Sequence, residues 1–268
     1  MRIIDVHTHA FPDELAARAT PRLADHGGII PSYDGTVAGL VGAMDRADVA
    51  VSVMLPVATK PGQVRVINDW AAGLAEPGSP WLGRIVPFGA MHPDFEDPAS
   101  EIARMAALGL RGIKMHPDYQ GYVPNEPRVQ PIYAAALEHG LWMLLHAGGD
   151  IVPQTYYGTP ETYADVLDTW PGLKVILAHM GGWRLWEAAA EHIIGRDVVL
   201  DTAYTPGHLP DEEFVGLVRE HGVERVVFGS DGPFADPAAE VEKLRAVGLT
   251  DAELELILGG NAARILGV

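Results

Sequence analysis

The stretch Arg2-Ile3-Ile4-Asp5-Val6-His7-Thr8-His9 opens the chain with a short apolar run that ends in two histidines. The β-branched residues are typical of a buried strand. On an extended strand, residues two apart point to the same face at a spacing of roughly 6.6 Å. The imidazoles of His7 and His9 can therefore converge on one ion, at the place where the strand ends.

Seven further apolar runs follow, with amphipathic helical stretches between them. Several runs are apolar almost throughout, as parallel strands covered on both faces are. The alternation predicts an α/β fold, a single (β/α)8 TIM barrel domain over residues 1–268, with an open doubly wound sheet as the alternative. The predicted strands after the first are Val49–Leu55, Arg84–Gly89, Leu110–Met115, Leu141–His146, Lys174–Ala178, Val198–Asp201 and Arg225–Gly229.

Two segments lie outside this alternation of strands and helices. Residues 10–35 are rich in proline and glycine, so we expect an irregular insertion over the barrel mouth after the first strand. The stretch Asp251–Leu266 predicts a C-terminal helical extension. We expect substrate specificity to come from mouth loops, at residues 10–35, 56–63, 117–127, 150–160 and 203–210.

The composition excludes several classes of function. The chain has 268 residues, a net charge of −17, 11 histidines and no cysteine. Thiolate metal sites and cysteine nucleophiles are excluded, and the charge disfavours nucleic acids and anionic membranes as partners. The N-terminus is unlike a signal peptide and the longest apolar run is too short for a membrane span. We therefore expect a cytoplasmic protein that acts on a small molecule.

Polar residues stand where other predicted strands end. Lys114 and His116 end one strand, His146 the next, His179 follows a third, and Asp231 follows the last. In a barrel the carboxyl ends of all strands face one mouth. Histidine nitrogens and carboxylate oxygens are ligands of zinc and other divalent cations, so the sequence predicts a metal site at this mouth.

The order of these motifs resembles the amidohydrolase superfamily, and within it the amidohydrolase-related group that includes aminocarboxymuconate semialdehyde decarboxylase. The resemblance covers nearly the whole chain, from Asp5–His9 to a closing helix at Gly260–Leu266. It implies a divalent metal, most often zinc, with manganese or iron as alternatives. It implies four ligands and gives Asp231 a second role as the proton shuttle; the ligands are His7, His9, His146 and Asp231.

Other residues have more than one expected role. By resemblance, His179 polarises the substrate, assists proton transfer or binds a second metal. Lys114 lies near the position of a lysine that is carboxylated and bridges two metals in binuclear relatives, and His116 has the same strand parity. We favour one tightly held metal, with Lys114 and His116 as substrate or second-metal groups. Mouth-loop candidates for a substrate carboxylate or carbonyl are Arg184, Tyr156 and Tyr157.

The resemblance favours a metal-dependent hydrolase in which a metal-activated water attacks an amide, lactone or ester carbonyl. The alternative is non-oxidative decarboxylation, or hydration, of a small unsaturated or aromatic acid, a lyase reaction. A non-catalytic barrel protein is a further alternative, which the complete ligand set disfavours. A homodimer is one expected assembly, with Trp183 and Trp186 as exposed candidates for its surface. We expect a structural hydrogen bond at Asp5, a helix cap at Asn261, a loop position for His92, and solvated side chains for His26, His139, His192, His208 and His221.

Overall fold

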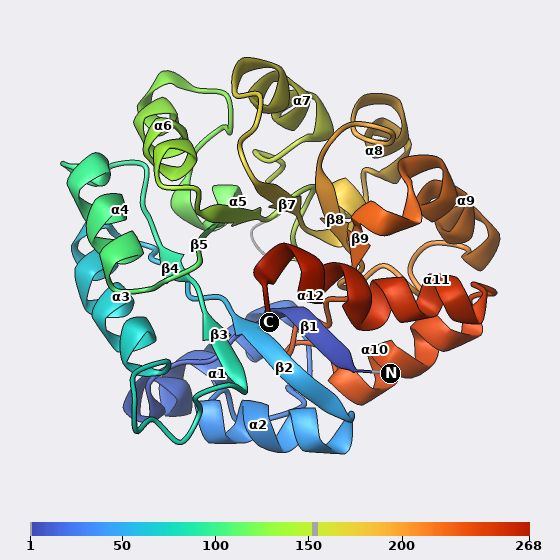
Figure 1. The fold of residues 1–268 in the computed structure, drawn as a ribbon, viewed down its shortest axis with the longest axis horizontal. Helices are drawn as coiled ribbons and strands as arrows, with labels where there is room; N and C mark the ends of the chain where they lie inside the picture. The colour runs from blue at the N-terminus through green and yellow to red at the C-terminus, as the bar shows by residue number, and fades with distance from the viewer. Residues whose placement is uncertain (1, 152–154) are drawn as a thin grey trace. The chain divides into compact units, whose positions relative to one another are not determined.

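The computed structural model describes residues 2–151 and 155–268. The chain divides into two compact units, a first unit of Met1–Met54 with Ile194–Val268 and a second unit of Leu55–Ile193. Parallel strands and helices alternate along both units (Figure 1). Within the described part of the chain, every helix is too short or too polar to cross a membrane.

The first unit holds two pairs of parallel strands. In β1 and β2 Ile4 lies opposite Val51, and in β8 and β9 Leu200 lies opposite Val226. The Val6 amide donates to the Phe228 carbonyl, which ties β1 to the segment that follows β9. The unit contains β1 (Ile3–Thr8), α1 (Asp13–Gly27), α2 (Val37–Arg46), β2 (Val49–Met54), β8 (Val199–Asp201), α9 (Asp211–His221), η4 (Val223–Arg225), β9 (Val226–Val227) and α10 (Pro237–Ala246).

The expected irregular insertion at residues 10–35 is wrong in part, because most of it is helix α1. The buried residues Ala16, Thr20 and Ala24 recur every four positions and form a stripe down one side of this helix. Pro21 lies within the helix and removes one backbone donor, but its position on the exposed side leaves that stripe intact. Packing of the stripe outweighs the local signal of the proline.

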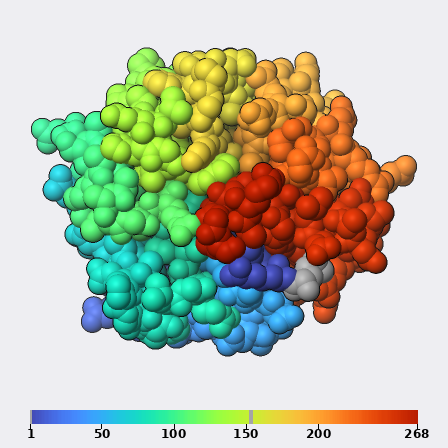
Figure 2. Space-filling view, in the orientation of Figure 1, coloured from blue at the N-terminus to red at the C-terminus, as the bar shows by residue number. Residues whose placement is uncertain are grey.

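The predicted C-terminal extension is helical. It consists of α11 (Asp251–Glu255), a π-helical segment η5 (Leu256–Gly260) and α12 (Asn261–Leu266). Figure 2 shows α12 in dark red beside the dark blue residues at the start of β1. A Cβ added to Gly259 would lie 1.9 Å from the Arg2 carbonyl oxygen, so this close approach needs glycine. The Asn261 side-chain amide donates to the carbonyls of Val223 and Val226, and so ties α12 to η4 and β9 rather than capping its own helix.

The second unit is built on four consecutive parallel strands, β4 to β7 (Figure 1). One predicted strand, Arg84–Gly89, is split into the short strands β3 and β4, and every other predicted run contains an observed strand. The elements are η1 (Pro61–Gln63), α3 (Val64–Gly73), β3 (Ile85–Pro87), β4 (Gly89–Ala90), α4 (Pro98–Ala107), β5 (Gly112–Met115), α5 (Pro117–Gln120), η2 (Pro127–Val129), α6 (Gln130–Glu138), β6 (Trp142–Leu145), α7 (Pro160–Thr169), β7 (Val175–Leu177), η3 (His179–Gly181) and α8 (Trp186–His192).

The register of these strands positions the polar residues that follow them. Lys114 of β5 lies opposite Leu144 of β6, and Met115 lies opposite Leu145. His116 and His146 are the next residues of the two strands, so they leave the sheet at the same edge. Their side chains share one face because each stands two positions after the Lys114–Leu144 pair.

Candidate functional site

In the first unit, three of the predicted metal ligands come together. The His9 Nε2 atom lies 3.1 Å from Oδ1 of Asp231, and the His7 Nε2 atom lies 3.4 Å from the same oxygen. The two imidazole centroids are 5.2 Å apart. The histidine pair at the end of β1 and the aspartate after β9 thus form one cluster.

Backbone hydrogen bonds hold this cluster in place. The Asp231 amide donates to the His7 carbonyl over 2.8 Å, and the hydroxyl of buried Tyr33 donates to the His9 carbonyl over 2.7 Å. Asp231 has a φ of +68°, a left-handed conformation that aspartate adopts more readily than most residues. The conformation and the amide bond together orient its carboxylate beside both histidines.

Two buried carboxylates support His7. Oδ2 of Asp201 lies 2.8 Å from Nδ1 of His7, a contact that the sequence analysis missed although Asp201 ends a predicted strand. Oδ1 of Asp5 accepts from the amides of His7 and Ser230, which confirms its expected structural hydrogen bond. Burial raises the pKa of Asp5 to about 7. Asp201 therefore holds the ring of His7, and Asp5 holds its backbone.

These residues fit a divalent metal. The Asp201 carboxylate accepts the Nδ1 proton of His7, so Nε2, on the side that faces Asp231, is the nitrogen that would bind a cation. His9 presents its own Nε2 to the same carboxylate oxygen. Two imidazole nitrogens and one carboxylate oxygen are a donor set that zinc, manganese and iron accept.

The second unit brings together His116, His146 and His179 with Asp150. Nε2 of His146 lies 2.8 Å from the Gly149 carbonyl and donates its proton there, so Nδ1 keeps its lone pair. Nδ1 lies 3.1 Å from Nε2 of His179. Burial, together with the charges of His116 and His179, lowers the pKa of His146 well below its usual value. His146 is therefore a neutral imidazole, the form that binds metals.

His116 forms a different arrangement in this cluster. Its ring stacks on His146 at a centroid distance of 3.9 Å and an angle of 11°, and its Nε2 lies 3.0 Å from Oδ2 of Asp150. His116, His146 and Asp150 bring ligand atoms within 4.8 Å of one another. Stacked imidazoles keep their lone pairs in separate, nearly parallel planes, and Nε2 of His116 already faces Asp150, so this trio suits an ion pair or a substrate contact better than one shared cation.

Lys114 lies in the second unit as the next-to-last residue of β5, and its side chain is fully buried. Its positive charge is among the influences that lower the pKa of His146, so it lies close to this cluster. Among the described residues, it is the only lysine or arginine in the buried class. A buried ammonium group attracts an organic anion, because little water screens its charge.

The predicted mouth-loop residues differ in their surroundings. Tyr156 is half-exposed, and its ring lies so close to Gly149 that a Cβ added there would be 2.5 Å from it. Arg184 is exposed, and its guanidinium carbon lies 4.1 Å from the centroid of the Trp183 ring.

The expected exposure of Trp183 is wrong, because its side chain is buried and its backbone amide donates to the Ala147 carbonyl. Trp186 is half-buried, and its Nε1 donates to the His179 carbonyl over 3.1 Å.

The remaining histidines mostly lie as predicted. His26, His139 and His208 are exposed, His192 is half-buried, and His92 is a buried loop residue whose Nδ1 accepts from the Asp94 amide. His221, expected to be solvated, is fully buried. The helical pattern of α9 did not reveal this, because its partners come from residues 195–198, before β8.

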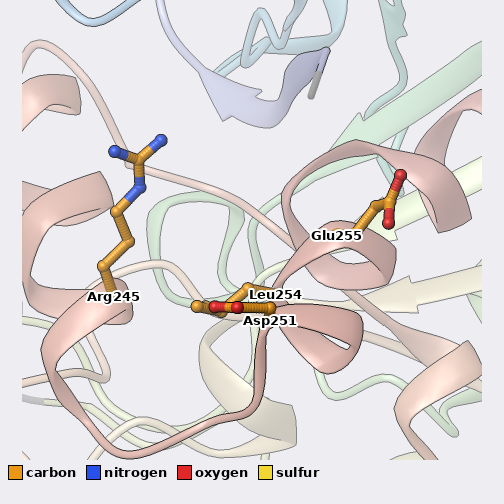
Figure 3. Close-up of a pocket in the computed structure, with 4 residues that line it drawn as sticks. All are labelled: Arg245, Asp251, Leu254 and Glu255. Atoms are coloured by element: carbon orange, nitrogen blue, oxygen red, sulfur yellow. The ribbon is translucent and has the colours of Figure 1, made fainter.

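Figure 3 shows a hollow in the first unit between the end of α10 and α11, with the Arg245 and Glu255 side chains on opposite sides of it. Asp251 and Leu254 complete its lining. It contains none of the predicted site residues, and we assign it no chemistry.

Residues 4–268 match the amidohydrolase family profile. No curated protein sequence matches the chain. An uncharacterised TIM-barrel protein from Bordetella bronchiseptica is 20% identical, with a TM-score of 0.79 over 100% of this chain and 99% of that chain.

Two further solved structures are decarboxylases. The 5-carboxyvanillate decarboxylase of Sphingomonas paucimobilis is 18% identical, with a TM-score of 0.73 over 100% of this chain and 99% of that chain. The enzyme of the same name from Novosphingobium aromaticivorans, complexed with manganese and 4-hydroxy-3-methoxy-5-nitrobenzoic acid, is 17% identical, with a TM-score of 0.74 over 100% and 96%. These likenesses show that the chain has the predicted TIM-barrel fold.

Proposed function

The chain belongs to the amidohydrolase family, and we propose that it is a metal-dependent decarboxylase. Its substrate would be a small aromatic or unsaturated carboxylic acid that loses carbon dioxide without oxidation. The observation that carries this proposal is the fully buried Lys114 beside the histidine cluster of the second unit, a setting that favours an organic anion. The names of the structural relatives support the same reaction class.

Hydrolysis, the reaction that the sequence favoured first, has weaker support. Both reactions use a metal and a carboxylate that moves a proton, so the cluster of His7, His9 and Asp231 serves either one. A buried cation gives no particular advantage with a neutral amide, lactone or ester. It does favour a substrate that enters as a carboxylate.

The proposed metal ligands are His7, His9 and Asp231, whose ligand atoms lie together in the first unit. His146 remains a fourth ligand on the strength of the family resemblance, and its neutral imidazole suits that role. Zinc, manganese and iron all fit these donors, and one structural relative is complexed with manganese. When bound, the metal supplies a positive charge that stabilises negative charge on the substrate.

The side chains of this chain supply the other requirements. Decarboxylation breaks the bond between the carboxylate carbon and its neighbour, and the electron pair left on the neighbour must take up a proton. Asp231 and His179 are the groups proposed to hold and deliver that proton. Lys114 and His116 are proposed to bind the substrate acid. A cytoplasmic location and a homodimer are further proposals.

The test is a panel of hydroxylated benzoic acids and unsaturated acids, with carbon dioxide release and substrate loss measured on metal-loaded protein. We expect release from at least one acid, with stoichiometric metal in the purified protein and loss of activity after chelation. In Asp231→Asn, turnover should fall at least ~100-fold. The matched control is Asp236→Asn, an exposed helix cap at which asparagine serves equally well.

Two outcomes contradict the proposal. Cleavage of amides, lactones or esters with no carbon dioxide release from any acid would favour hydrolysis. Equal turnover of Asp231→Asn and Asp236→Asn would remove Asp231 from the proton transfer.

A further inference from the structure

We propose that Asp201 is a positioning residue for the metal: its carboxylate holds His7 in the tautomer that presents Nε2 as a ligand. This inference rests on the metal site of the proposed function. It adds a residue to that site that the sequence motifs did not indicate. Asp201 touches neither substrate nor metal in this proposal, and it acts only through His7.

The contact is well defined by burial and distance. The Asp201 and His7 side chains are 0% and 1% exposed, and Oδ2 lies 2.8 Å from Nδ1. The opposite edge of the same ring carries Nε2, 3.4 Å from Asp231. Because a carboxylate only accepts, Nδ1 must carry the proton. Nε2 is then the nitrogen of His7 that would give up any proton and bind a cation.

Asp201 meets two demands at once, one with each oxygen. Oδ1 accepts from the Ala203 amide over 3.1 Å, while Oδ2 accepts from His7. Both partners are donors, so the side chain needs two acceptor atoms at fixed places. A carboxylate is the only side-chain group of this size that provides them.

Asparagine cannot meet both demands although it has the same shape. If its oxygen accepts from the Ala203 amide, its NH₂ group faces Nδ1 of His7 and selects the tautomer protonated at Nε2, which blocks the ligand atom. If its oxygen faces His7, the NH₂ group meets the Ala203 amide, donor against donor. The first orientation of the asparagine lowers metal affinity, and the second lowers the stability of the folded protein.

A purely structural role for Asp201 makes a different prediction. It would lower stability without changing which nitrogen of His7 is protonated. Thr202→Val provides the matched control, because Thr202 is the next residue, is also buried, and exchanges weak hydrogen bonds with Gly229 through its hydroxyl. It removes a polar contact at the same strand end, and that contact is with Gly229 rather than with the His7 ring.

The experiment measures zinc and manganese affinity by chelator competition in the wild type, Asp201→Asn and Thr202→Val. The His7 tautomer is read in metal-free protein by NMR with ¹⁵N-labelled histidine, assigned with His7→Gln. Mutation of a residue that orients a metal ligand in this way typically lowers metal affinity by roughly 10–100-fold. We expect a loss of that size in Asp201→Asn, with His7 shifted to the Nε2-protonated form. Thr202→Val should stay within about twofold of the wild type.

The outcomes separate this inference from the proposed function. If the wild type binds no metal, the proposed function and the proposed role of Asp201 are both refuted. If the wild type binds metal and Asp201→Asn binds it equally well with an unchanged His7 tautomer, only the role of Asp201 is refuted. An equal loss of affinity in Thr202→Val and Asp201→Asn would also refute it. If Asp201→Asn fails to fold, the wild-type spectrum still decides, because a wild-type His7 that carries no proton on Nδ1 contradicts the proposal.

Discussion

His221 should make the stability of the protein depend on pH between about 4 and 6.5. Its Nε2 donates to the Val198 carbonyl over 2.9 Å, and its Nδ1 accepts from the Gly195 amide over 3.2 Å. The ring is fully buried and uncharged in this arrangement. Burial lowers its pKa from 6.5 to about 4, an effect that the nearby Arg225 increases and Glu224 reduces.

The sign follows from which state binds the proton. Between pH 6.5 and 4 the unfolded chain binds a proton at His221 and the folded chain does not, so acid favours unfolding. The stabilisation is fully present above pH 6.5 and is lost as the pH falls toward 4. A shift of this size corresponds to about 2 kcal/mol of unfolding free energy between roughly pH 7.5 and 5, at 1.36 kcal/mol per pKa unit.

The assay is urea unfolding of metal-free protein at a series of pH values, for the wild type and His221→Gln. Glutamine keeps a donor for Val198 and an acceptor for Gly195 but cannot be protonated. The difference between the two proteins isolates His221 from the other groups that titrate in acid. We expect the unfolding free energy of the wild type to fall by about 2 kcal/mol more than that of His221→Gln over this range.

Two results would refute this reasoning. If the wild type and His221→Gln lose stability in parallel from pH 7.5 to 5, the His221 ring is not held neutral by burial. If the variant is the more acid-sensitive protein, the sign is wrong.

Three further changes test other parts of the structure. The Gln120 side chain accepts from the His116 amide and donates to two backbone carbonyls, so Gln120→Leu should cost about 2–4 kcal/mol in urea unfolding; an unchanged midpoint would contradict this. Gly259→Ala forces a Cβ against the Arg2 carbonyl and should cost about 1–3 kcal/mol, seen as a lower Tm, and an equal Tm would show that the contact relaxes freely. Lys114→Met keeps the volume and removes the charge, so KM for the substrate acid should rise at least ~10-fold, whereas an unchanged KM would exclude Lys114 from acid binding.

Much of the fold could be predicted because its signals are local. Apolar runs such as Val175–Leu177 and amphipathic stretches such as α2 depend on residues close together in the chain. Gly109, Gly140, Gly222 and Gly248, which follow amphipathic helical stretches, have positive φ angles, as glycines that end helices commonly do. Helix α1 was missed because Pro21 is a strong local signal against it, while the contacts that stabilise the helix are tertiary.

The candidate site was predictable in its residue types but not in its partners. The absence of cysteine and the placement of His7, His9 and Asp231 at strand ends indicated a histidine and carboxylate site from the sequence alone. Strand parity also placed Lys114 and His116 on one face but could not choose between them. The structure shows Lys114 fully buried and His116 stacked on His146.

The sequence by itself determined the order of strands and helices and the chemistry available at the strand ends. Only the tertiary structure decided which groups meet: Asp201 with His7, Asp150 with His116, and His221 with the segment before β8. Asp201 and His7 are separated by 194 residues, so no local pattern links them. The hydrogen-bond partner of an imidazole decides which ring nitrogen carries the proton. Only the folded chain brings that partner next to the ring.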